Sequence, residues 1–425
     1  VPDNPGASRK GAVSPLSDRQ VGDMKAVIVG VGAVGSVVAD LLTRSEEYDE
    51  VVVGDIDLER AKAMEKRLSS DKASAARIDA SDTDGMARAF KGADLVVNGV
   101  IPKFNFNIMD ACLAAKANYA DMASDIFLSK EKPGEIVKEP PIQWEIAKYT
   151  AAYEKAGIIG MLGLGCEPGI ANVFARLAAD KMDTVKDILI RDGDTGQIEG
   201  YEFAPLWSPQ TLIEEVLMPA MVYKDGHYRK VKPFSGKEQF EFPSPVGTLP
   251  IYNVDHEEQE TLPTYIGEVL GKGCEYCDFK LALGDEYVET IRTVGRLGMH
   301  SSEKIDVKGV KVAPIDVVSA CIPDPAAIGD RATGEFTAVN VTTGTKDGKD
   351  VGYRIHTYMN HKDCWNSHGH SATAYTVGVP MAIGAILMAR GQISQKGVFP
   401  PEMLDAKPVV DMLPEFGMNC IVTKL

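Results

Sequence analysis

Short apolar runs alternate with amphipathic stretches along residues 24–165. The apolar runs are KAVIV, EVVVGD, ARIDA, DLVVNGV, YADMA and GIIGMLG, and the stretches between them carry apolar residues at helical spacing. A parallel sheet covered by helices on both faces produces this pattern, because its strands are buried on both sides. We therefore predict a doubly wound α/β domain of the Rossmann type over residues 24–165. Its helices should start near Ala33, Leu58 and Asp82 and also cover about 107–116 and 144–155.

The pattern changes from about residue 185 onward. Strand-like phrases such as KDILIRD, KEQFEFPS and EYCDFKLALG are separated by turns that contain glycine. The phrase GEFTAVNVTTGTKDGKDVGYRIHTYMNH alternates with period two on either side of KDGKD, which predicts a β-hairpin. A mostly antiparallel α+β substrate domain is therefore expected over residues 166–370.

Three other segments lie outside this scheme. Residues 371–391 are apolar on most helical faces, so we expect a buried helix that returns to pack on the first domain. Residues 129–141, SKEKPGEIVKEPP, are charged and rich in proline, which predicts a surface loop that could act as a lid. Residues 1–23 are rich in Pro, Gly and Ser without periodicity, which predicts a disordered tail or a vector scar.

The composition narrows the classes of function. The 425 residues carry 61 acidic and 45 basic side chains, a net charge of −16, and no stripe of lysine or arginine that would neutralise phosphates. Nucleic acid is therefore excluded as an expected partner. No stretch approaches the roughly 18 apolar residues of a membrane span, and the first residues lack a signal-peptide pattern. We expect a soluble, cytoplasmic protein with no membrane partner.

The seven cysteines are scattered and do not form a disulfide framework, which fits a reducing compartment. Two stretches hold potential metal ligands, the C-x-x-C of Cys274 and Cys277 and the segment HKDCWNSHGH at 361–370. No second pair stands at zinc spacing, and the Gly, Asn and Ser content of the second stretch favours a loop. We expect no metal site.

The first apolar run is followed by Gly30, Gly32 and Gly35, which fit G-x-G-x-x-G between a strand and a helix. In this motif the glycines allow a tight turn, close approach of the pyrophosphate and close helix packing, and the helix N-terminus faces the phosphates. Asp55, twenty residues past Gly35, ends the next strand, where a carboxylate can accept hydrogen bonds from both ribose hydroxyls. This carboxylate would repel a 2′-phosphate, so we predict NAD in preference to NADP.

Other residues beside this motif complete the candidate cofactor site. Asp79 ends the third strand and could neighbour the adenine, although a helix-capping role is equally natural for this stretch. The full set of candidate cofactor contacts is Gly30, Gly32, Ala33, Val34, Gly35, Asp55, Ile56, Asp79, Ala80 and Asn98.

Several longer phrases resemble the saccharopine dehydrogenase-like family, in the same order along residues 25 to about 402. They are VVNGVIPKFNFNIMDACLAAKANYADMASD, AYEKAGIIGMLGLGCEPGIANVFA, WSPQTLIEEVLMPAMVYKDG, TAYTVGVPMAIGAILMARGQI and GVFPPE. This resemblance implies an oxidoreductase that acts on CH–NH2 or CH–NH groups of a small amine or amino acid, as a homodimer.

Within the family, the phrases EFPSPVGTLPIY and ETLPTYI resemble lysine 6-dehydrogenase. That likeness implies oxidation of the ε-amine of L-lysine by NAD, which yields 2-aminoadipate 6-semialdehyde and ammonia. The phrase IQWEIAKYTAAYEKAGIIG is also similar to carboxynorspermidine dehydrogenase, so the alternative is a reductase of a secondary amine, of the saccharopine or carboxynorspermidine/carboxyspermidine type. A regulatory domain that senses NAD without turnover is a third hypothesis, which the large second domain disfavours.

Amine oxidation requires a base near the reacting nitrogen. Asp121 and Glu167 are the candidate catalytic residues, because both follow strands at the edge where doubly wound folds bind ligands. Each has a structural alternative, since Asp121 could close its strand and Glu167 could sit at the N-terminus of a helix opened by Pro168. Tyr119 and His256 are candidate substrate contacts, although packing is the simpler role for Tyr119.

A lysine-like substrate also carries a carboxylate, which calls for an arginine or a helix N-terminus. Spacing does not choose among the eight arginines after residue 150, which are Arg176, Arg191, Arg229, Arg292, Arg296, Arg331, Arg354 and Arg390. The acidic stretch DHEEQE at 255–260 is expected to form a solvated face that could still attract a cationic substrate.

Overall fold

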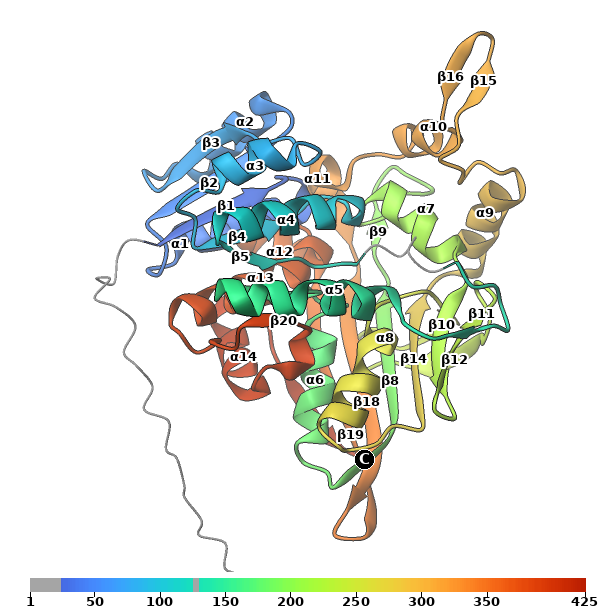
Figure 1. Cartoon of the computed structure of the whole chain (residues 1–425). Coiled ribbons are helices and arrows are strands. Elements are labelled where there is room, and N and C mark those ends of the chain that lie inside the picture. Colours follow the sequence, from blue (N-terminus) through green and yellow to red (C-terminus); the bar gives the residue numbers. More distant parts are fainter. Residues whose placement is uncertain (1–23, 125–129) are drawn as a thin grey trace, which may run out of the picture.

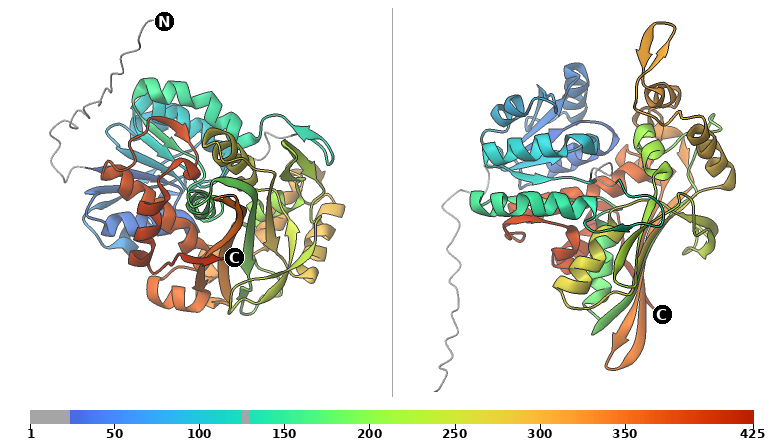
Figure 2. Two further views of the ribbon diagram at one scale, coloured as in Figure 1. Left: turned by 90° about the horizontal axis from the view of Figure 1, so that it is seen from below. Right: turned by 45° about the vertical axis from the view of Figure 1, so that its right-hand side comes forward.

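The structure is a computed structural model that describes residues 24–124 and 130–425 (Figure 1). The predicted tail, residues 1–23, and the first residue of the predicted 129–141 loop lie outside this range. Two β-sheets, sheet A and sheet B, organise the described chain, and Figure 2 shows them side by side with helices packed on sheet A.

Sheet A consists of seven parallel strands in the order β20-β7-β5-β4-β1-β2-β3. Alternate residues of one strand enter different cores, since Ala26 and Ile28 pack with one layer of helices and Val27 and Val29 with the other. The predicted Rossmann-type sheet is therefore confirmed. Its strands are β1 (Lys25–Val29), β2 (Glu50–Asp55), β3 (Ala73–Arg77), β4 (Leu95–Asn98), β5 (Asn118–Ala120), β7 (Ile159–Met161) and β20 (Gly397–Phe399).

Helices cover both faces of sheet A. One core joins α1 and α13 to the sheet, and the other joins α3, α4 and α5 to its opposite face. The elements around sheet A are α1 (Ala33–Arg44), α2 (Leu58–Leu68), α3 (Thr83–Ala89), η1 (Pro102–Phe104), α4 (Asn105–Ala115), α5 (Pro141–Ala156), α13 (Ala372–Ala389), η5 (Pro401–Met403), α14 (Ala406–Met412) and η6 (Leu413–Phe416).

Helix α13 packs against α1, as its apolar pattern predicts. The hydroxyl of Tyr48 donates to the carbonyl of Ala385 at 3.0 Å. Gly378 lies so close to α1 that an added Cβ would stand 2.5 Å from Cγ1 of Val37. Contrary to expectation, α13 is long and apolar enough to cross a membrane by composition, but 83% of it is buried inside the protein. Helix α13 is therefore a core element that packs a late segment of the chain onto α1, near the start of the described residues.

Sheet B has ten strands and is antiparallel except between β8 and β14. The predicted hairpin is present as β18 and β19, joined by Asp347 and Gly348, both at positive φ. Its strands are β6 (Ile136–Val137), β8 (Thr184–Asp194), β10 (Ala220–Lys224), β11 (His227–Val231), β12 (Glu238–Glu241), β13 (Thr248–Asn253), β14 (Tyr276–Ala282), β18 (Glu335–Lys346), β19 (Lys349–Asn360) and β21 (Ile421–Lys424).

Smaller elements surround sheet B. A separate hairpin, β15 (Ile305–Val307) and β16 (Val310–Val312), projects from the molecule (Figure 1). The remaining elements are α6 (Ile170–Ala179), β9 (Gln197–Ile198), α7 (Pro209–Leu217), α8 (Glu258–Leu262), the π-helix η3 (Pro263–Val269), α9 (Asp285–Arg296), α10 (Pro314–Cys321), α11 (Pro325–Ile328), η4 (Gly329–Arg331), β17 (Ala332–Thr333) and α12 (His361–His368).

Two predicted loops contain regular structure instead. The 361–370 segment forms α12, because the Asn360 side chain accepts a hydrogen bond from the Asp363 amide at 2.9 Å and Gly369 ends the helix at φ 72°. Within the predicted 129–141 loop, Ile136–Val137 form β6, which pairs with β11 at the edge of sheet B. These residues are therefore anchored to the second sheet rather than held only at their ends.

Candidate functional site

The glycine-rich loop between β1 and α1 has the shape that a dinucleotide requires. Gly30 adopts φ +92°, and a Cβ on Gly35 would lie 2.0 Å from the Gly30 carbonyl oxygen, so both are fixed by the local fold. A Cβ on Gly32, in contrast, would meet nothing within 4 Å. Helix α1 starts after Gly32 with neither a side-chain cap nor an acidic residue in its first turn. The open space and the uncapped amides fit a bound pyrophosphate.

Asp55 lies at the end of β2 beside this loop, as predicted. Its Oδ2 accepts from the Val31 amide at 3.2 Å and its Oδ1 from the Asp57 amide at 3.0 Å. The carboxylate therefore also fixes the glycine loop. Ile56 is 60% exposed next to it. Asp79, after β3, accepts hydrogen bonds from Ser81, which lower the pKa of its carboxyl, and Ala80 is buried.

Three other predicted site residues form a buried network at the ends of β4 and β5. Asn98 Nδ2 donates to the Tyr119 hydroxyl at 2.9 Å, and that hydroxyl donates to Asp121 Oδ2 at 2.8 Å. Asp121 Oδ1 accepts from the Gly163 amide at 2.7 Å. Burial raises the pKa of Asp121 to about 7 although both hydrogen bonds lower it.

This network is a correction to the predicted contacts of Tyr119 and Asn98. Tyr119 is fully buried and none of the three residues is among the described residues that line the cavity, so Tyr119 does not contact a substrate there. Both polar atoms of the Asn98 side chain are engaged inside the protein, with Oδ1 accepting from the Val100 amide at 3.1 Å. Both Asp121 oxygens are engaged by the Tyr119 hydroxyl and the Gly163 amide, and a catalytic role for Asp121 stays a prediction.

A cavity of about 590 Å³ lies between the two sheets. Val34 on α1 and residues 122–124 after β5 line its dinucleotide-domain side, so it adjoins the glycine loop. Asp192 and Asp194 on β8 and Phe279 on β14 line the side formed by sheet B, and another wall is formed by residues 204–208, 210, 211, 214 and 215. A reacting substrate in this cavity would stand beside a dinucleotide on the loop.

The structure brings together Glu167 and His256 on this cavity, two residues that are distant in the sequence. Both carboxyl oxygens of Glu167 are buried and accept no hydrogen bond from an amide, hydroxyl or cation of the described chain, and the carboxyl instead shares a hydrogen bond with the carboxyl of Asp192. Burial, followed by the charges of Asp192 and Glu258, raises the pKa of Glu167 well above its ordinary value. The carboxyl therefore holds a proton more tightly than an ordinary carboxyl and can exchange one with a ligand.

Glu167 does not cap the following helix, which was its structural alternative. Helix α6 begins at Ile170 rather than at Pro168, and its N-cap is Gly169. The Gly169 amide donates to the side chain of Asn172 at 3.0 Å, which supplies the local capping bond.

His256 lies in an acidic cluster that sequence reasoning only partly identified. Its Nε2 lies 3.1 Å from Glu215 and its Nδ1 lies 2.5 Å from Glu258, while its ring stacks on Phe279 with centroids 4.0 Å apart. Burial alone would lower the pKa of His256, but the charges of Glu258 and Glu215 outweigh it and raise the pKa well above 6.5. His256 is therefore a cation among carboxylates.

The stretch DHEEQE was predicted to be a solvated face, and this prediction is wrong. Glu258 and Gln259 are fully buried, and Asp255 forms a buried ion pair with Lys230 at 2.8 Å. Glu257 Oε1 accepts from the Ser124 amide at 2.6 Å, which connects the stretch to the loop after β5. Burial raises the pKa of Glu257 to about 7 despite the opposing charge of His256. A charged run can be buried where its members pair with cations and amides.

Asp192 and Asp194 were missed by sequence reasoning. They stand two residues apart on β8, so both project from the same face of sheet B, into the cavity. Burial and then the charge of Asp194 raise the pKa of Asp192 to about 8. The available signal was the acidic alternation DGD at the end of a strand, because an acidic residue on a buried strand face needs a partner.

Among the described residues, His256, Glu257 and Glu258 form a group whose ligand atoms lie within 4.8 Å and could hold a metal ion. The nitrogen ligand in this group is already bonded to Glu258. Neither stretch noted from the sequence, 274–277 or 361–370, contributes to the group.

Comparisons with known proteins agree with this architecture. The chain matches the family models described as the saccharopine dehydrogenase NADP binding domain over residues 26–161 and the saccharopine dehydrogenase C-terminal domain over residues 165–418. It is 30% identical to carboxyaminopropylagmatine dehydrogenase of Synechocystis, covering 93% of this chain and 96% of that protein. It is 29% identical to carboxynorspermidine synthase of Vibrio alginolyticus, with the same two coverages.

Two solved structures share the fold over almost the whole chain. Saccharopine dehydrogenase from Saccharomyces cerevisiae has a TM-score of 0.66 at 17% identity and covers 95% of this chain and 100% of its own. Homospermidine synthase from Legionella pneumophila, in complex with NAD, has a TM-score of 0.69 at 14% identity and covers 95% and 91%. The chain therefore belongs to the saccharopine dehydrogenase family, and it is a nicotinamide-dependent oxidoreductase that acts on amine groups.

Proposed function

We propose that this enzyme joins a diamine to an amino-acid semialdehyde and reduces the product to a carboxylated polyamine. The observation that carries the proposal is the charge of the cavity. Seven carboxyl residues line it, against Lys103 and His256 as the cationic residues among the described lining, and that lining contains no arginine. The carboxyl residues are Glu167, Asp192, Asp194, Glu214, Glu215, Asp255 and Glu257. Such a cavity suits a substrate with several ammonium groups.

The names of the relatives support the same substrate class. Carboxynorspermidine and carboxyaminopropylagmatine are both polyamines that carry a carboxyl group. Disconnecting the secondary amine nearest that carboxyl gives aspartate semialdehyde and either 1,3-diaminopropane or agmatine. Saccharopine dehydrogenation is less well supported, because saccharopine brings several carboxylates into a cavity in which Lys103 is the lysine of the described lining. Lysine dehydrogenation is less well supported, because neither relative is named for lysine.

The reaction has two balanced steps. The neutral amine adds to the aldehyde and water leaves, which forms an imine, and the imine then takes up a hydride and a proton to become a secondary amine. When bound at Gly32 and the start of α1, the reduced dinucleotide supplies the hydride. Glu167 and Asp192 are suited to accept the proton that an incoming ammonium must lose, because burial places their proton affinity above that of an ordinary carboxyl. Asp121 accepts from the Gly163 amide and so anchors the start of the loop that leads to Glu167.

The test is a comparison of two assays on the full chain. NAD(P)H with 1,3-diaminopropane or agmatine and aspartate semialdehyde should be oxidised, with a secondary amine identified by mass spectrometry. With NAD(P)⁺, the kcat/KM for L-lysine should be at least about tenfold lower than the kcat/KM for oxidation of that secondary amine. Release of ammonia from L-lysine at the higher rate would replace the proposal with lysine 6-dehydrogenation.

A further inference from the structure

Two acidic residues on one strand divide the cavity along its length. Asp192 and Asp194 both line it, and alternate residues of a strand are separated by about 6.6 Å. Asp192 shares a hydrogen bond with Glu167 and interacts electrostatically with His256, and both of these residues also line the cavity. Asp194 instead faces residues from α12 and α9. The spacing is one that the two nitrogens of a three-carbon diamine can bridge.

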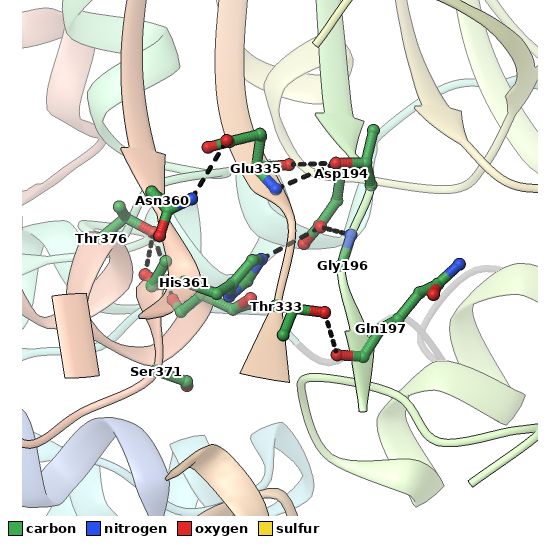
Figure 3. Close-up of polar contacts among 12 residues, drawn as sticks. Asp194, Gly196, Gln197, Thr333, Glu335, Asn360, His361, Ser371 and Thr376 are labelled. Carbon is green, nitrogen blue, oxygen red and sulfur yellow. Dashed lines mark hydrogen bonds and ion pairs between the residues drawn. The ribbon is translucent and has the colours of Figure 1, made fainter. Parts of the chain in front are cut away.

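Asp194 is held in place through one of its two oxygens. Oδ1 accepts from the Gly196 amide at 2.5 Å and from His361 Nε2 at 3.1 Å, as Figure 3 shows. A Cβ on Gly196 would lie 2.6 Å from that oxygen and 3.0 Å from the imidazole nitrogen, so no larger residue fits there. Oδ2 accepts no hydrogen bond within the described residues, and the side chain remains 14% exposed in the cavity. One oxygen is thus fixed and the other is left for a ligand.

A second polar group on the wall of this cavity also has no hydrogen-bond partner among the described residues. The hydroxyl of Tyr287 on α9 is buried without a hydrogen-bond partner in the described chain, and Tyr287 lines the same cavity. Asp194 and Tyr287 line the same cavity, and burial, followed by the charge of Asp194, raises the pKa of Tyr287. The Tyr287 ring is fixed by stacking on Phe203 with centroids 4.4 Å apart. A buried hydroxyl without a partner costs free energy that a ligand can recover.

We propose that Asp194 and Tyr287 form an outer ammonium subsite, in which the carboxylate Oδ2 and the phenol oxygen accept hydrogen bonds from the far nitrogen of a diamine. His361 is a positioning residue for Asp194. The subsite selects substrates that carry a second cation at a fixed distance from the reacting amine. For its substrate class the inference rests on the proposed function.

The test measures binding rather than turnover. The full chain saturated with NAD⁺ is titrated calorimetrically with 1,3-diaminopropane and with propylamine, which has the same carbon chain and a single nitrogen. The wild type should bind the diamine at least about tenfold more tightly, the value of one hydrogen bond to a charged group. Asp194→Asn should reduce this ratio below about threefold, and His361→Phe should reduce it in the same direction.

Two further variants keep the test decisive. Tyr287→Phe removes only the unpartnered hydroxyl, so it should fold normally and still lower the ratio. Asp350→Asn, at an exposed position on β19, is the matched control and should leave the ratio unchanged. A wild-type ratio near one, or a ratio unaffected by Asp194→Asn and Tyr287→Phe, overturns the subsite. A preference for the diamine without secondary-amine formation keeps the subsite and refutes the proposed reaction.

Discussion

Glu167 and Asp121 were equal candidates in the sequence, and their surroundings now separate them. Glu167 lies in the cavity wall beside another carboxyl, Asp192, whereas both Asp121 oxygens accept hydrogen bonds from a hydroxyl and an amide inside the protein. Glu167→Gln should lower kcat by about 10²-fold or more, because the amide cannot carry the proton. Steady-state kinetics across pH 6–9 measure this loss, and near-normal turnover would remove Glu167 from the reaction.

Asp121→Asn should act mainly on stability. One of its two acceptor oxygens becomes an NH2 group facing a donor, which costs about 1–3 kcal/mol of unfolding free energy. Thermal unfolding of the variant should therefore show a lower Tm, with a smaller loss of kcat than in Glu167→Gln. The opposite ranking of the two variants in kcat would assign the proton transfer to Asp121.

Lys103 in η1 is the lysine of the described cavity lining. If it binds the carboxylate of the semialdehyde, Lys103→Ala should raise the KM for the semialdehyde by about tenfold, the value of one charged hydrogen bond, while changing the KM for the diamine less. The KM values of the two substrates, measured separately, check this. An equal change in the two KM values would show that Lys103 does not bind the carboxylate of the semialdehyde.

At the scale of elements, Asp55 connects the end of β2 to the glycine loop that follows β1. Its carboxylate accepts one hydrogen bond from the Val31 amide in that loop and one from the Asp57 amide after β2. Asp55→Ala should weaken NAD binding by about 1–3 kcal/mol and improve NADP binding, since the carboxylate that repels a 2′-phosphate is removed. The kcat/KM for each cofactor, before and after the change, measures the effect. An unchanged ratio would show that Asp55 supports the loop without reading the ribose.

The contact between α1 and α13 makes a second prediction at this scale. Gly378→Val places a Cβ 2.5 Å from Cγ1 of Val37, where the helices are already packed. The overpacking should cost about 1–3 kcal/mol. The matched control Ala63→Val, exposed on α2, changes helix propensity alone and should cost about 0.5 kcal/mol. Equal unfolding midpoints for the two variants would contradict the close approach.

The elements that sequence patterns predicted best were those with repeated local signals. Strands of sheet A, the β18–β19 hairpin and α13 all carry their periodicity in the chain itself. Strand β20 was missed because Gly397–Phe399 is too short to show a period, and α12 was missed because its composition resembles a loop. The acidic cavity was largely missed because the burial of DHEEQE depends on Lys230 and on the Ser124 amide, which are distant in the sequence.

At the scale of the whole molecule, buried carboxyls link stability to pH. Burial is the main cause that raises the pKa of Asp121 to about 7, Asp192 to about 8, Glu257 to about 7 and Glu402 to about 7. In the unfolded chain such groups titrate near pH 4. Between about pH 4 and the raised pKa values the folded protein binds more protons than the unfolded chain. The associated stability therefore decreases as the pH rises through this interval and is fully lost above about pH 7 to 8.

The ligand-free protein should accordingly show a Tm that decreases from pH 6 to pH 8.5. A bound diamine should offset this decrease, because its charges favour ionised carboxylates in the cavity. Diamine binding should also release protons, so its heat should depend on the ionisation enthalpy of the buffer at pH 7. A Tm that rises over this range would show that the cavity carboxyls are ionised without a ligand.

Strand β20 carries a consequence for how the chain is made. It pairs with β7 in sheet A, yet it follows the whole of sheet B except β21 in the sequence. During synthesis the first six strands of sheet A leave the ribosome with the edge of β7 uncovered and with α13 missing from the face of α1. The nascent dinucleotide domain therefore cannot complete its sheet until almost the entire chain has been synthesised. Until then the open edge of β7 and the apolar face of α1 are surfaces that a chaperone would bind.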